Sequence, residues 1–465
     1  GKSKKYGKLY HEHFGGESVL NDTIAAVSTA LQDGAISIIR ISGPESLILA
    51  EKLFSRSVVD QPTHTVRYGY ILDPISREAV DEVLLTVFRA PKTFTCEDVV
   101  EISCHGGRYI TRRILALVLA EGARLADPGE FTRRAFLNGR IDLTQAEAVM
   151  DMIDADSSQQ AQMAIQGIRG SIRRLIEPLN EALLNIIANI EVNIDYPEYE
   201  DAQQLTWESV LPQARRWLGQ MDEILQRAES GRIMKKGVKT VILGKPNVGK
   251  SSLLNALLEE DKAIVTEIAG TTRDLVEGEI HLRNVTLHLI DTAGIHKTDD
   301  RVEQIGIERS MKALEEAELI LIVLDASRPQ DDEDRRLLDL TEGRNRIVVV
   351  NKKDLAPQCE DRSGTISICA AQNQIEPLIN EINHRYEHHH AMLELPSLAN
   401  ERQIALARQA RQSMAQAVSA LEAGAELDLV TIDLQAAYMA LKEIIGEASR
   451  EDLLDALFSK FCLGK

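Results

Sequence analysis

The sequence has 465 residues, 44% of them hydrophobic, which is enough to bury cores in two to four domains. Its 53 basic and 72 acidic residues give a formal net charge of -19, which excludes a whole-surface affinity for nucleic acid and restricts any RNA contact to a local patch. Five scattered cysteines without a C-x-x-C spacing argue against a disulfide framework or a zinc site, and no apolar run approaches the roughly 20 residues of a membrane span. We therefore expect a globular cytoplasmic protein.

The first part of the chain predicts a small α+β domain. Residues 1–18 are polar, contain glycine and begin without methionine, so we expect a disordered expression remnant. Short strands are predicted at 36–43, 83–89 and 99–104, and a helix at 110–120, within a domain that spans 19–134. The composition of this domain does not by itself indicate a function.

The next part of the chain has an almost continuous helical pattern. Core-facing helices are predicted at 143–150 and 179–194, with Pro178 in the first turn of the second. The acidic stretch 195–201 predicts a solvated loop. Arg169, Arg173 and Arg174 form a basic cluster that fits either a solvated helix face or a contact with RNA phosphates.

Helical pattern resumes over 397–460, after an intervening segment of different character. We expect a helical domain formed by 135–236 plus 389–465, interrupted by an inserted domain at 237–388. His388-His389-His390 would be a polar linker rather than a metal site, since no cysteine lies near it.

The inserted domain opens with a phosphate-binding loop of the pattern G-x-x-x-x-G-K-[ST]. Gly244-Lys245-Pro246-Asn247-Val248-Gly249-Lys250-Ser251 lies between an apolar strand at 238–243 and a helical repeat at 252–258. Glycines allow backbone N–H groups to surround phosphate oxygens at a helix N-terminus. Lys250 would reach the outer phosphates, and Ser251 would hold magnesium.

Three further motifs each follow a predicted strand. Asp291-Thr292-Ala293-Gly294 follows 285–290, and its aspartate can hold magnesium through water. Asn351-Lys352-Lys353-Asp354 follows 346–350, and Asp354 can accept two hydrogen bonds from guanine that adenine cannot supply. In Ser367-Ile368-Cys369-Ala370, Cys369 stands where GTPases usually have serine. Four motifs at strand ends predict a Ras-like α/β P-loop GTPase domain.

One residue expected of many small GTPases is absent. Ile295 occupies the position of the glutamine that orients the attacking water, and an apolar residue cannot do so. Glu303 is the nearest carboxylate that could replace it. On spacing alone, Glu303 fits a solvated residue of a helix start equally well.

Several of these segments together resemble the TrmE (MnmE) family of tRNA-modification GTPases. The resemblance rests on Asn247, on the stretch from Val265 to Asp274, and on Phe461-Cys462-Leu463-Gly464-Lys465, and it runs from about Asn21 onward. It implies a multidomain chain with an α+β amino-terminal domain, an all-α helical domain and an inserted GTPase domain. It also implies G domains that dimerise across their nucleotides, with potassium in place of an arginine finger.

The resemblance further implies the residues of the nucleotide site. Glu303 and Lys250 would be catalytic. Magnesium would lie on Ser251 and Thr272, and potassium on Asn247, Thr266, Ile268 and Thr271. The residues expected to bind GTP are Asn247, Val248, Gly249, Lys250, Ser251, Ser252, Thr266, Glu267, Ile268, Ala269, Gly270, Thr271, Thr272, Asp291, Thr292, Ala293, Gly294, Asn351, Lys352, Asp354, Cys369, Ala370 and Ala371.

A second site is implied in the amino-terminal domain, which in the family dimerises and binds a tetrahydrofolate one-carbon donor. The matching residues are Arg40, Glu101, Arg140 and Lys465, and each fits a surface salt bridge when taken singly. The donor would be 5,10-methylenetetrahydrofolate or 5-formyltetrahydrofolate. Cys462 would serve the modification chemistry as a catalytic residue, although its spacing also fits a packed thiol.

The resemblance implies a potassium-dependent GTPase that works on tRNA. It would act as a homodimer within a heterotetramer with the flavin-dependent MnmG (GidA), and would add an aminomethyl or carboxymethylaminomethyl group to carbon 5 of the wobble uridine. A regulatory GTP switch in ribosome assembly, without folate chemistry, is the alternative.

Overall fold

The computed structural model describes residues 21–195, 202–260, 276–290, 314–355, 364–391, 396–448, 451–461 and 464. The chain forms two compact units, each of which draws on separated stretches of sequence. Unit 1 contains Gly1–Ala155, Ala164–Glu191 and Thr431–Lys465, and unit 2 contains Asp156–Met163 and Val192–Val430. Within the described residues, no helix has the length and apolar character needed to cross a membrane.

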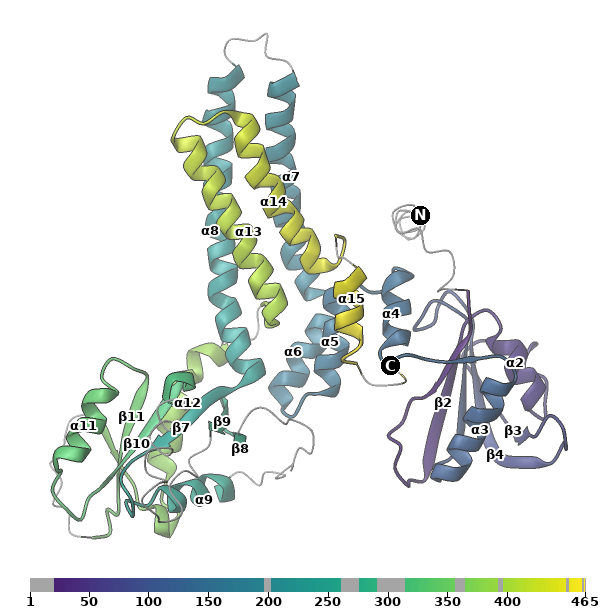
Figure 1. Cartoon of the computed structure of the whole chain (residues 1–465), viewed down its shortest axis with the longest axis horizontal. Coiled ribbons are helices and arrows are strands. Elements are labelled where there is room, and N and C mark those ends of the chain that lie inside the picture. The colour runs from purple at the N-terminus through teal and green to yellow at the C-terminus, as the bar shows by residue number, and fades with distance from the viewer. Residues whose placement is uncertain are drawn as a thin grey trace, which may run out of the picture. The chain divides into compact units, whose positions relative to one another are not determined.

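Unit 1 contains a six-stranded sheet with two helices packed on one face (Figure 1). Its strand order is β3-β4-β5-β2-β1-β6, and neighbouring strands are antiparallel except β1 and β6. The elements are β1 (Ile24–Val27), β2 (Ile36–Ser42), α2 (Ser46–Leu53), β3 (Thr65–Leu72), β4 (Ala79–Phe88), β5 (Val99–His105), α3 (Arg108–Ala120) and β6 (Arg124–Leu125).

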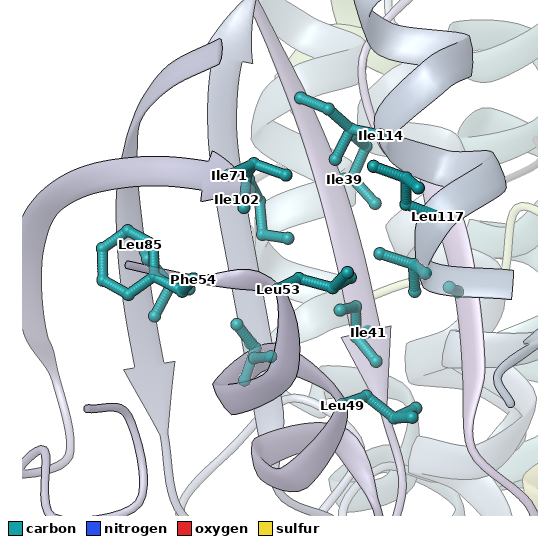
Figure 2. Packing of buried hydrophobic residues seen from close by; sticks show 14 of the residues in the cluster. Ile39, Ile41, Leu49, Leu53, Phe54, Ile71, Leu85, Ile102, Ile114 and Leu117 are labelled. Carbon is teal, nitrogen blue, oxygen red and sulfur yellow. The ribbon is translucent and has the colours of Figure 1, made fainter. Parts of the chain in front are cut away.

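Alternation along the strands separates the core of this sheet from its other face. Ile39 and Ile41 of β2 are fully buried beside Leu53 of α2 and Ile114 of α3, as Figure 2 shows. Arg40 lies between those two isoleucines and therefore points to the opposite face, where it stands across from Glu101 of β5. The core thus fixes the face on which this pair lies.

The helices that follow the sheet bring distant parts of the sequence into unit 1. Phe136 and Leu143 form one hydrophobic cluster with Leu454, Phe458 and Phe461. The helices of this region are α4 (Glu130–Leu137), α5 (Leu143–Ile153) and α15 (Glu451–Phe458), together with most of α7 (Ser171–Asp195) and α14 (Leu427–Ile445). The division between the units falls within α6 (Ser158–Ile168), after Met163. A capping box between Asp142 and Gln145 starts α5.

The predicted place of Pro178 is wrong. Pro178 lies inside α7, which begins at Ser171 rather than at the proline. Ile172 and Ile176 are buried ahead of the proline, and Leu179 and Leu183 are buried after it. Apolar packing on both sides holds the helix together although proline lacks an N–H group.

Unit 2 contains a mixed, mostly parallel sheet with the order β12-β11-β10-β7-β9-β8. In β10, Leu319, Leu321 and Val323 pack in one core with α9 and α12, and the alternate residues pack with α11 on the other face. A parallel strand buried on both faces is apolar throughout, as here. The elements are β7 (Val238–Leu243), α9 (Lys250–Glu260), β8 (Val276–His281), β9 (Thr286–Ile290), β10 (Leu319–Asp325), α11 (Asp332–Leu340), β11 (Arg346–Asn351), β12 (Thr365–Ser367) and α12 (Glu376–Ala391).

Two long helices of unit 2, α8 (Ala202–Lys236) and α13 (Glu401–Glu422), run antiparallel. Arg215 pairs with Glu422 at 2.6 Å, Arg411 with Asp222 at 2.8 Å, and Lys236 with Glu401. The linker predicted at His388-His389-His390 is wrong, because these residues belong to α12. That helix buries Leu378, Ile382 and Tyr386 against the sheet, which carries the helix to Ala391.

Candidate functional sites

The phosphate-binding loop joins β7 to α9, and its shape depends on two glycines. Gly244 has φ +154°, and a Cβ there would lie 2.5 Å from the Val323 carbonyl oxygen. Gly249 has φ +99°, and its Cβ would lie 2.2 Å from Nδ2 of Asn351. Asn247 also has a positive φ of 63°. This backbone fits the concave anion site that the sequence predicts.

The side chain of Lys250 is held inside this loop. Its Nζ donates to the carbonyl oxygens of Gly244 at 2.6 Å and Lys245 at 2.7 Å. Burial lowers the pKa of Lys250. Ser251 and Ser252 lie exposed in the first turn of α9, so their hydroxyls are open to a ligand at the loop.

Asn351 connects the phosphate loop to the loop expected behind the base. It is 2% exposed. Its Nδ2 donates to the Val248 carbonyl at 2.9 Å, and its Oδ1 accepts from the Ala370 N–H at 3.0 Å. The structure thereby brings together three residues predicted for GTP binding.

Lys352 makes a second connection, through a residue that sequence reasoning missed. Its Nζ donates to the Asn247 carbonyl at 2.8 Å and to Oδ2 of Asp325 at 2.7 Å. Burial opposes ionisation of Asp325, but hydrogen bonds from Lys352 and Ser327 lower its pKa overall. Asp325 ends the parallel strand β10, and this position at a carboxyl end was the available signal.

Asp354 and Cys369 meet where the guanine base is expected. The Cys369 thiol donates to Oδ1 of Asp354 at 3.2 Å. Burial, together with the hydrogen bond to Asp354, raises the pKa of this thiol, so it stays a protonated donor. Ala370 and Ala371 follow in a short 3-10 turn, η2 (Ala370–Gln372).

The remaining predicted residues of this site, and two predicted for the second site, lie outside the described residues. They are Thr266, Glu267, Ile268, Ala269, Gly270, Thr271, Thr272, Asp291, Thr292, Ala293, Gly294, Glu303, Cys462 and Lys465.

The second candidate site lies on the face of the unit 1 sheet opposite α2 and α3, where Phe131 of α4 packs with Ile24 and Ala26. Arg40 Nε pairs with Glu101 at 2.8 Å, and the guanidinium lies 5.6 Å from the centre of the Phe131 ring. The carbonyl of Gly464 accepts from Ser28 Oγ at 3.1 Å and from Arg40 Nη1 at 3.4 Å. Gly464, 424 positions away in the sequence, thus contacts the expected folate residue Arg40, which pairs with Glu101.

Arg140, the other described residue predicted for folate, is held separately. Its guanidinium lies 5.1 Å from the centre of the Phe94 ring and donates to the Thr93 carbonyl at 2.5 Å. Phe94 packs against the small cluster that contains Phe131, the ring beneath Arg40. The two arginines therefore stand on aromatic rings of one cluster.

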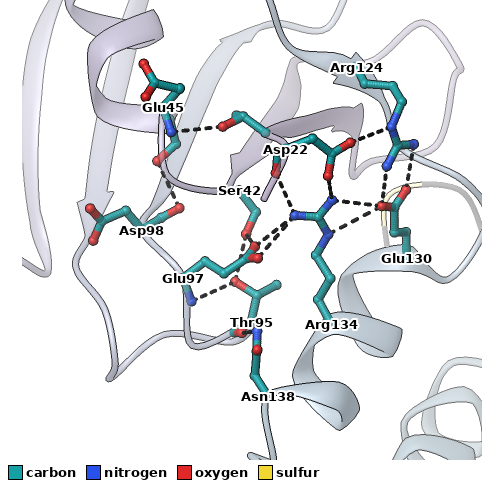
Figure 3. Close-up of polar contacts among 12 residues, drawn as sticks. Asp22, Ser42, Glu45, Thr95, Glu97, Asp98, Arg124, Glu130, Arg134 and Asn138 are labelled. Atoms are coloured by element: carbon teal, nitrogen blue, oxygen red, sulfur yellow. Dashed lines mark hydrogen bonds and ion pairs between the residues drawn. The ribbon is translucent and has the colours of Figure 1, made fainter. Parts of the chain in front are cut away.

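A buried ionic network supports this region and was not predicted (Figure 3). Arg134, with 2% of its side chain exposed, contacts Asp22 at 2.5 Å, Glu130 at 2.9 Å and Glu97 at 3.1 Å. Burial raises the pKa of Glu97 against the attraction of Arg134. Burial also opposes ionisation of Glu130, yet hydrogen bonds from Arg124, the Asp127 N–H and Arg134 lower its pKa overall.

The basic cluster at Arg169, Arg173 and Arg174 is engaged within its own unit. Arg173 pairs with Glu447 at 2.6 Å and lies 3.7 Å from the buried Asp142. Arg174 donates to the Arg169 carbonyl at 2.7 Å. These contacts favour a structural role over an open RNA-binding face.

Comparison with known proteins gives matches along nearly the whole chain. A family model described as "GTP-binding protein TrmE N-terminus" matches residues 23–140, and one described as "MnmE helical domain" matches 143–462. A protein of Lactobacillus delbrueckii subsp. bulgaricus named "tRNA modification GTPase MnmE" is 48% identical over 457 residues, 96% of this chain and 98% of its own length. A Geobacillus thermodenitrificans protein of the same name is 47% identical over 461 residues, 96% of this chain and 99% of its own.

Among solved structures, the chain is similar to Aquifex aeolicus Era bound to GDP and aluminium fluoride. The two are 24% identical with a TM-score of 0.25, and the match covers 38% of this chain and 67% of the other.

Proposed function

Because the chain belongs to the MnmE family of tRNA modification GTPases, we propose that it couples potassium-dependent GTP hydrolysis to modification of carbon 5 of the tRNA wobble uridine. Its activity as a GTP hydrolase in tRNA modification is the premise. The proposal adds the partner, the flavin-dependent MnmG, and the carbon source, a tetrahydrofolate. The product would be an aminomethyl or carboxymethylaminomethyl uridine.

The domain assignment is part of this proposal. Residues 19–134 would bind folate and dimerise, 135–236 with 389–465 would form the helical domain, and 237–388 would form the G domain. Two such chains would assemble with MnmG into a heterotetramer on tRNA.

The phosphate loop supports the nucleotide part of the proposal. Its glycine-dependent backbone and the half-buried Lys250 ammonium fit a polyphosphate, and Ser251 lies exposed beside them. Magnesium bound there would neutralise charge on the phosphates, and Ser251 and Thr272 would hold it. Lys250 would exchange its two carbonyl partners for phosphate oxygens, because an ammonium binds anionic acceptors more strongly.

The potassium part rests on Asn247. Its positive φ of 63° places it at a tight point of the loop, where it is exposed. Its side chain has no hydrogen-bond partner among the described residues, and its amide oxygen suits a hard cation. Asn247, Thr266, Ile268 and Thr271 would hold potassium, which would stabilise charge that develops between the phosphates.

The folate part rests on one observation, the approach of Gly464 to Arg40. That contact joins the Gly464 carbonyl to the arginine of the Arg40–Glu101 pair, and Cys462 and Lys465 would act beside it. A guanidinium and a carboxylate side by side can make bidentate pairs with the ring amide and glutamyl carboxylate of a folate. Arg140, on the same aromatic cluster, would supply a further positive charge.

The experiment that tests this function is GTP hydrolysis in potassium chloride against sodium chloride at equal ionic strength. Intact protein should hydrolyse GTP much faster in potassium, and Asn247→Ala should lose most of that advantage. Asn255→Ala, on the exposed side of α9, is the matched control and should behave as wild type. Equal rates in both salts would remove the cation mechanism and favour a regulatory switch.

A further inference from the structure

Four residues in the first two turns of α3 line an open hollow of about 490 Å³ on unit 1. They are Arg108, Tyr109, Arg112 and Arg113, and we call them the α3 patch. Arg108 with Arg112, and Tyr109 with Arg113, are four residues apart, so each pair lies on one side of the helix. Three guanidinium groups and one aromatic ring are thereby gathered on a single surface.

The arginines stand at the end of α3 where helix electrostatics disfavour them. A helix N-terminus carries a partial positive charge, which favours acidic rather than basic side chains. The first turn of α3 contains no acidic residue, and its N-cap, Gly107, makes no side-chain capping bond. The electrostatics of the helix end therefore do not account for the arginines, and such local conflicts are typical of functional sites.

Their ion pairs leave the patch largely open. Arg108 lies 3.6 Å from Asp33, and 61% and 77% of these two side chains are exposed. Arg113 pairs with Asp73 at 2.5 Å. Arg112 is exposed and has no charged partner among the described residues. The Arg108–Asp33 pair is exposed on both sides and contributes little, so a polyanion can replace it, whereas Asp73, 16% exposed, holds Arg113 in place.

Tyr109 narrows the chemistry of the partner. It is 76% exposed, next to Arg108 and within a helical turn of Arg112 and Arg113. An aromatic face among arginines suits unpaired bases, which stack on the ring while guanidinium groups bind the adjacent phosphates in bidentate fashion. A purely acidic protein surface would make no use of the ring. On a chain of net charge -19, such a patch is the local site that RNA binding requires.

We propose that the α3 patch is a docking surface for the RNA substrate, with Arg108, Arg112 and Arg113 on phosphates and Tyr109 stacked on an unpaired base. The inference rests on the proposed function in tRNA modification and gives the tRNA a contact on this chain. It also replaces the cluster at Arg173 and Arg174, whose contacts lie within unit 1.

The test measures binding of an unmodified tRNA transcript to the full chain by fluorescence anisotropy over a range of salt concentrations. Tyr109→Ala should weaken binding roughly thirtyfold, the middle of the range for base stacking. Arg112→Ala should reduce the slope of log affinity against log salt by about one. The control is Arg216→Glu against Arg112→Glu, because Arg216 is exposed on α8 and the change in charge is equal.

The possible results separate a failure of the α3 patch from a failure of the proposed function in tRNA modification. Weaker tRNA binding by Arg112→Glu but not Arg216→Glu, with GTP hydrolysis unchanged, supports the patch. Wild-type affinity in both Arg112→Glu and Tyr109→Ala overturns it and leaves the tRNA-modification function standing. Normal tRNA binding with lost association with MnmG would make the patch a protein-docking surface, which also overturns it. If even the wild-type chain binds no tRNA, the patch is overturned and the proposed tRNA contact fails with it.

Discussion

At the residue scale, Asn351 holds together two loops that approach the nucleotide from different strands. Its amide uses a donor and an acceptor in opposite directions, to Val248 and to Ala370, inside a site from which water is almost excluded. An aspartate would lose the donor, and a leucine would lose both functions. Only an amide side chain of this length satisfies the two backbone groups at once.

Asn351→Ala should lower both stability and nucleotide affinity. The Val248 carbonyl and the Ala370 N–H would lose their buried partner, at a cost of roughly 2 to 4 kcal/mol in the free energy of unfolding of the nucleotide-free protein. Thermal unfolding and titration with a fluorescent GTP analogue would measure the two effects. Asn255→Ala is the control, and equal melting temperatures in the two variants would contradict the coupling.

At the scale of elements, the ionic network around Arg134 joins parts of unit 1 that are far apart in sequence. Asp22 precedes β1, Glu97 precedes β5, and Glu130 and Arg134 belong to α4. Arg134 reaches all three carboxylates from one buried position (Figure 3). Arg124 of β6 also pairs with Asp22 at 2.7 Å and with Glu130 at 2.5 Å, so two guanidinium groups hold α4 on the sheet, and Arg134 is the one that reaches Glu97.

Arg134→Met should destabilise unit 1 strongly. Filling the space with an apolar chain leaves Glu97 without a cation, while Asp22 and Glu130 lose one of their two guanidinium partners and keep Arg124. Breaking a buried pair in this way costs about 3 to 5 kcal/mol. Calorimetry on the full chain would detect it. Lys52→Met, which breaks the exposed Lys52–Glu121 pair at 3.2 Å, should cost less than about 1 kcal/mol. Similar losses in both variants would show that the network is no stronger than a surface pair.

The same variant has a pH dependence of known sign. The pKa values of Asp22 and Glu130 are lowered in the fold, so their stabilisation is present above their ordinary values of 3.8 and 4.5 and is lost as pH falls through the lowered values. Glu97, whose pKa burial raises, acts in the opposite direction. The stability gap between wild type and Arg134→Met should therefore narrow below about pH 4.

Elements with a clear hydrophobic pattern could be predicted from the sequence. Elements that depend on contacts with residues far away in the sequence could not. The strand predicted at 238–243 matches β7, because a central parallel strand is apolar throughout. Strand β3 was not predicted, since its inward position at Gly69 has no side chain and lies against the ring of Phe54, while Tyr68 and Tyr70 are exposed. The Arg134 network escaped prediction because Asp22 lies 112 residues away.

For the candidate sites too, residues in local motifs could be predicted from the sequence, and residues that depend on distant partners could not. The phosphate loop and Asn351 follow from local motifs, whereas Asp325 depends on a contact with Lys352, 27 residues on. The family resemblance implied Arg40 and Glu101 only as separate folate residues, and their pairing was not predicted, because sequence spacing does not show which strands are neighbours.

At the scale of the whole chain, the contact of Gly464 with β1 ties two distant parts of the sequence within unit 1. Gly464 has φ +88°, and a Cβ on it would lie 2.3 Å from the Val27 carbonyl oxygen. No other residue type fits that position without moving the backbone. The approach of this segment to Arg40 therefore depends on a glycine.

Gly464→Ala should detach this segment while leaving GTP hydrolysis intact. Loss of the bonds from Ser28 and Arg40 should weaken binding of 5-formyltetrahydrofolate and reduce tRNA modification. Gly139→Ala is the matched control, since Gly139 also has a positive φ, +70°, but nothing within 4 Å of its Cβ position. Unchanged folate binding in Gly464→Ala would refute the role of the segment, and equal loss in both variants would indicate backbone strain alone.

The distance in sequence between Ser28 and Gly464 has a consequence for biosynthesis. Ser28 leaves the ribosome 436 residues before the residue whose carbonyl it binds. At about 5 to 20 residues per second, that delay is roughly 20 to 90 seconds. The sheet of unit 1 can form early, but its contact with Gly464 waits for nearly the whole chain. A nascent or prematurely released chain would therefore carry the Arg40–Glu101 pair without this contact.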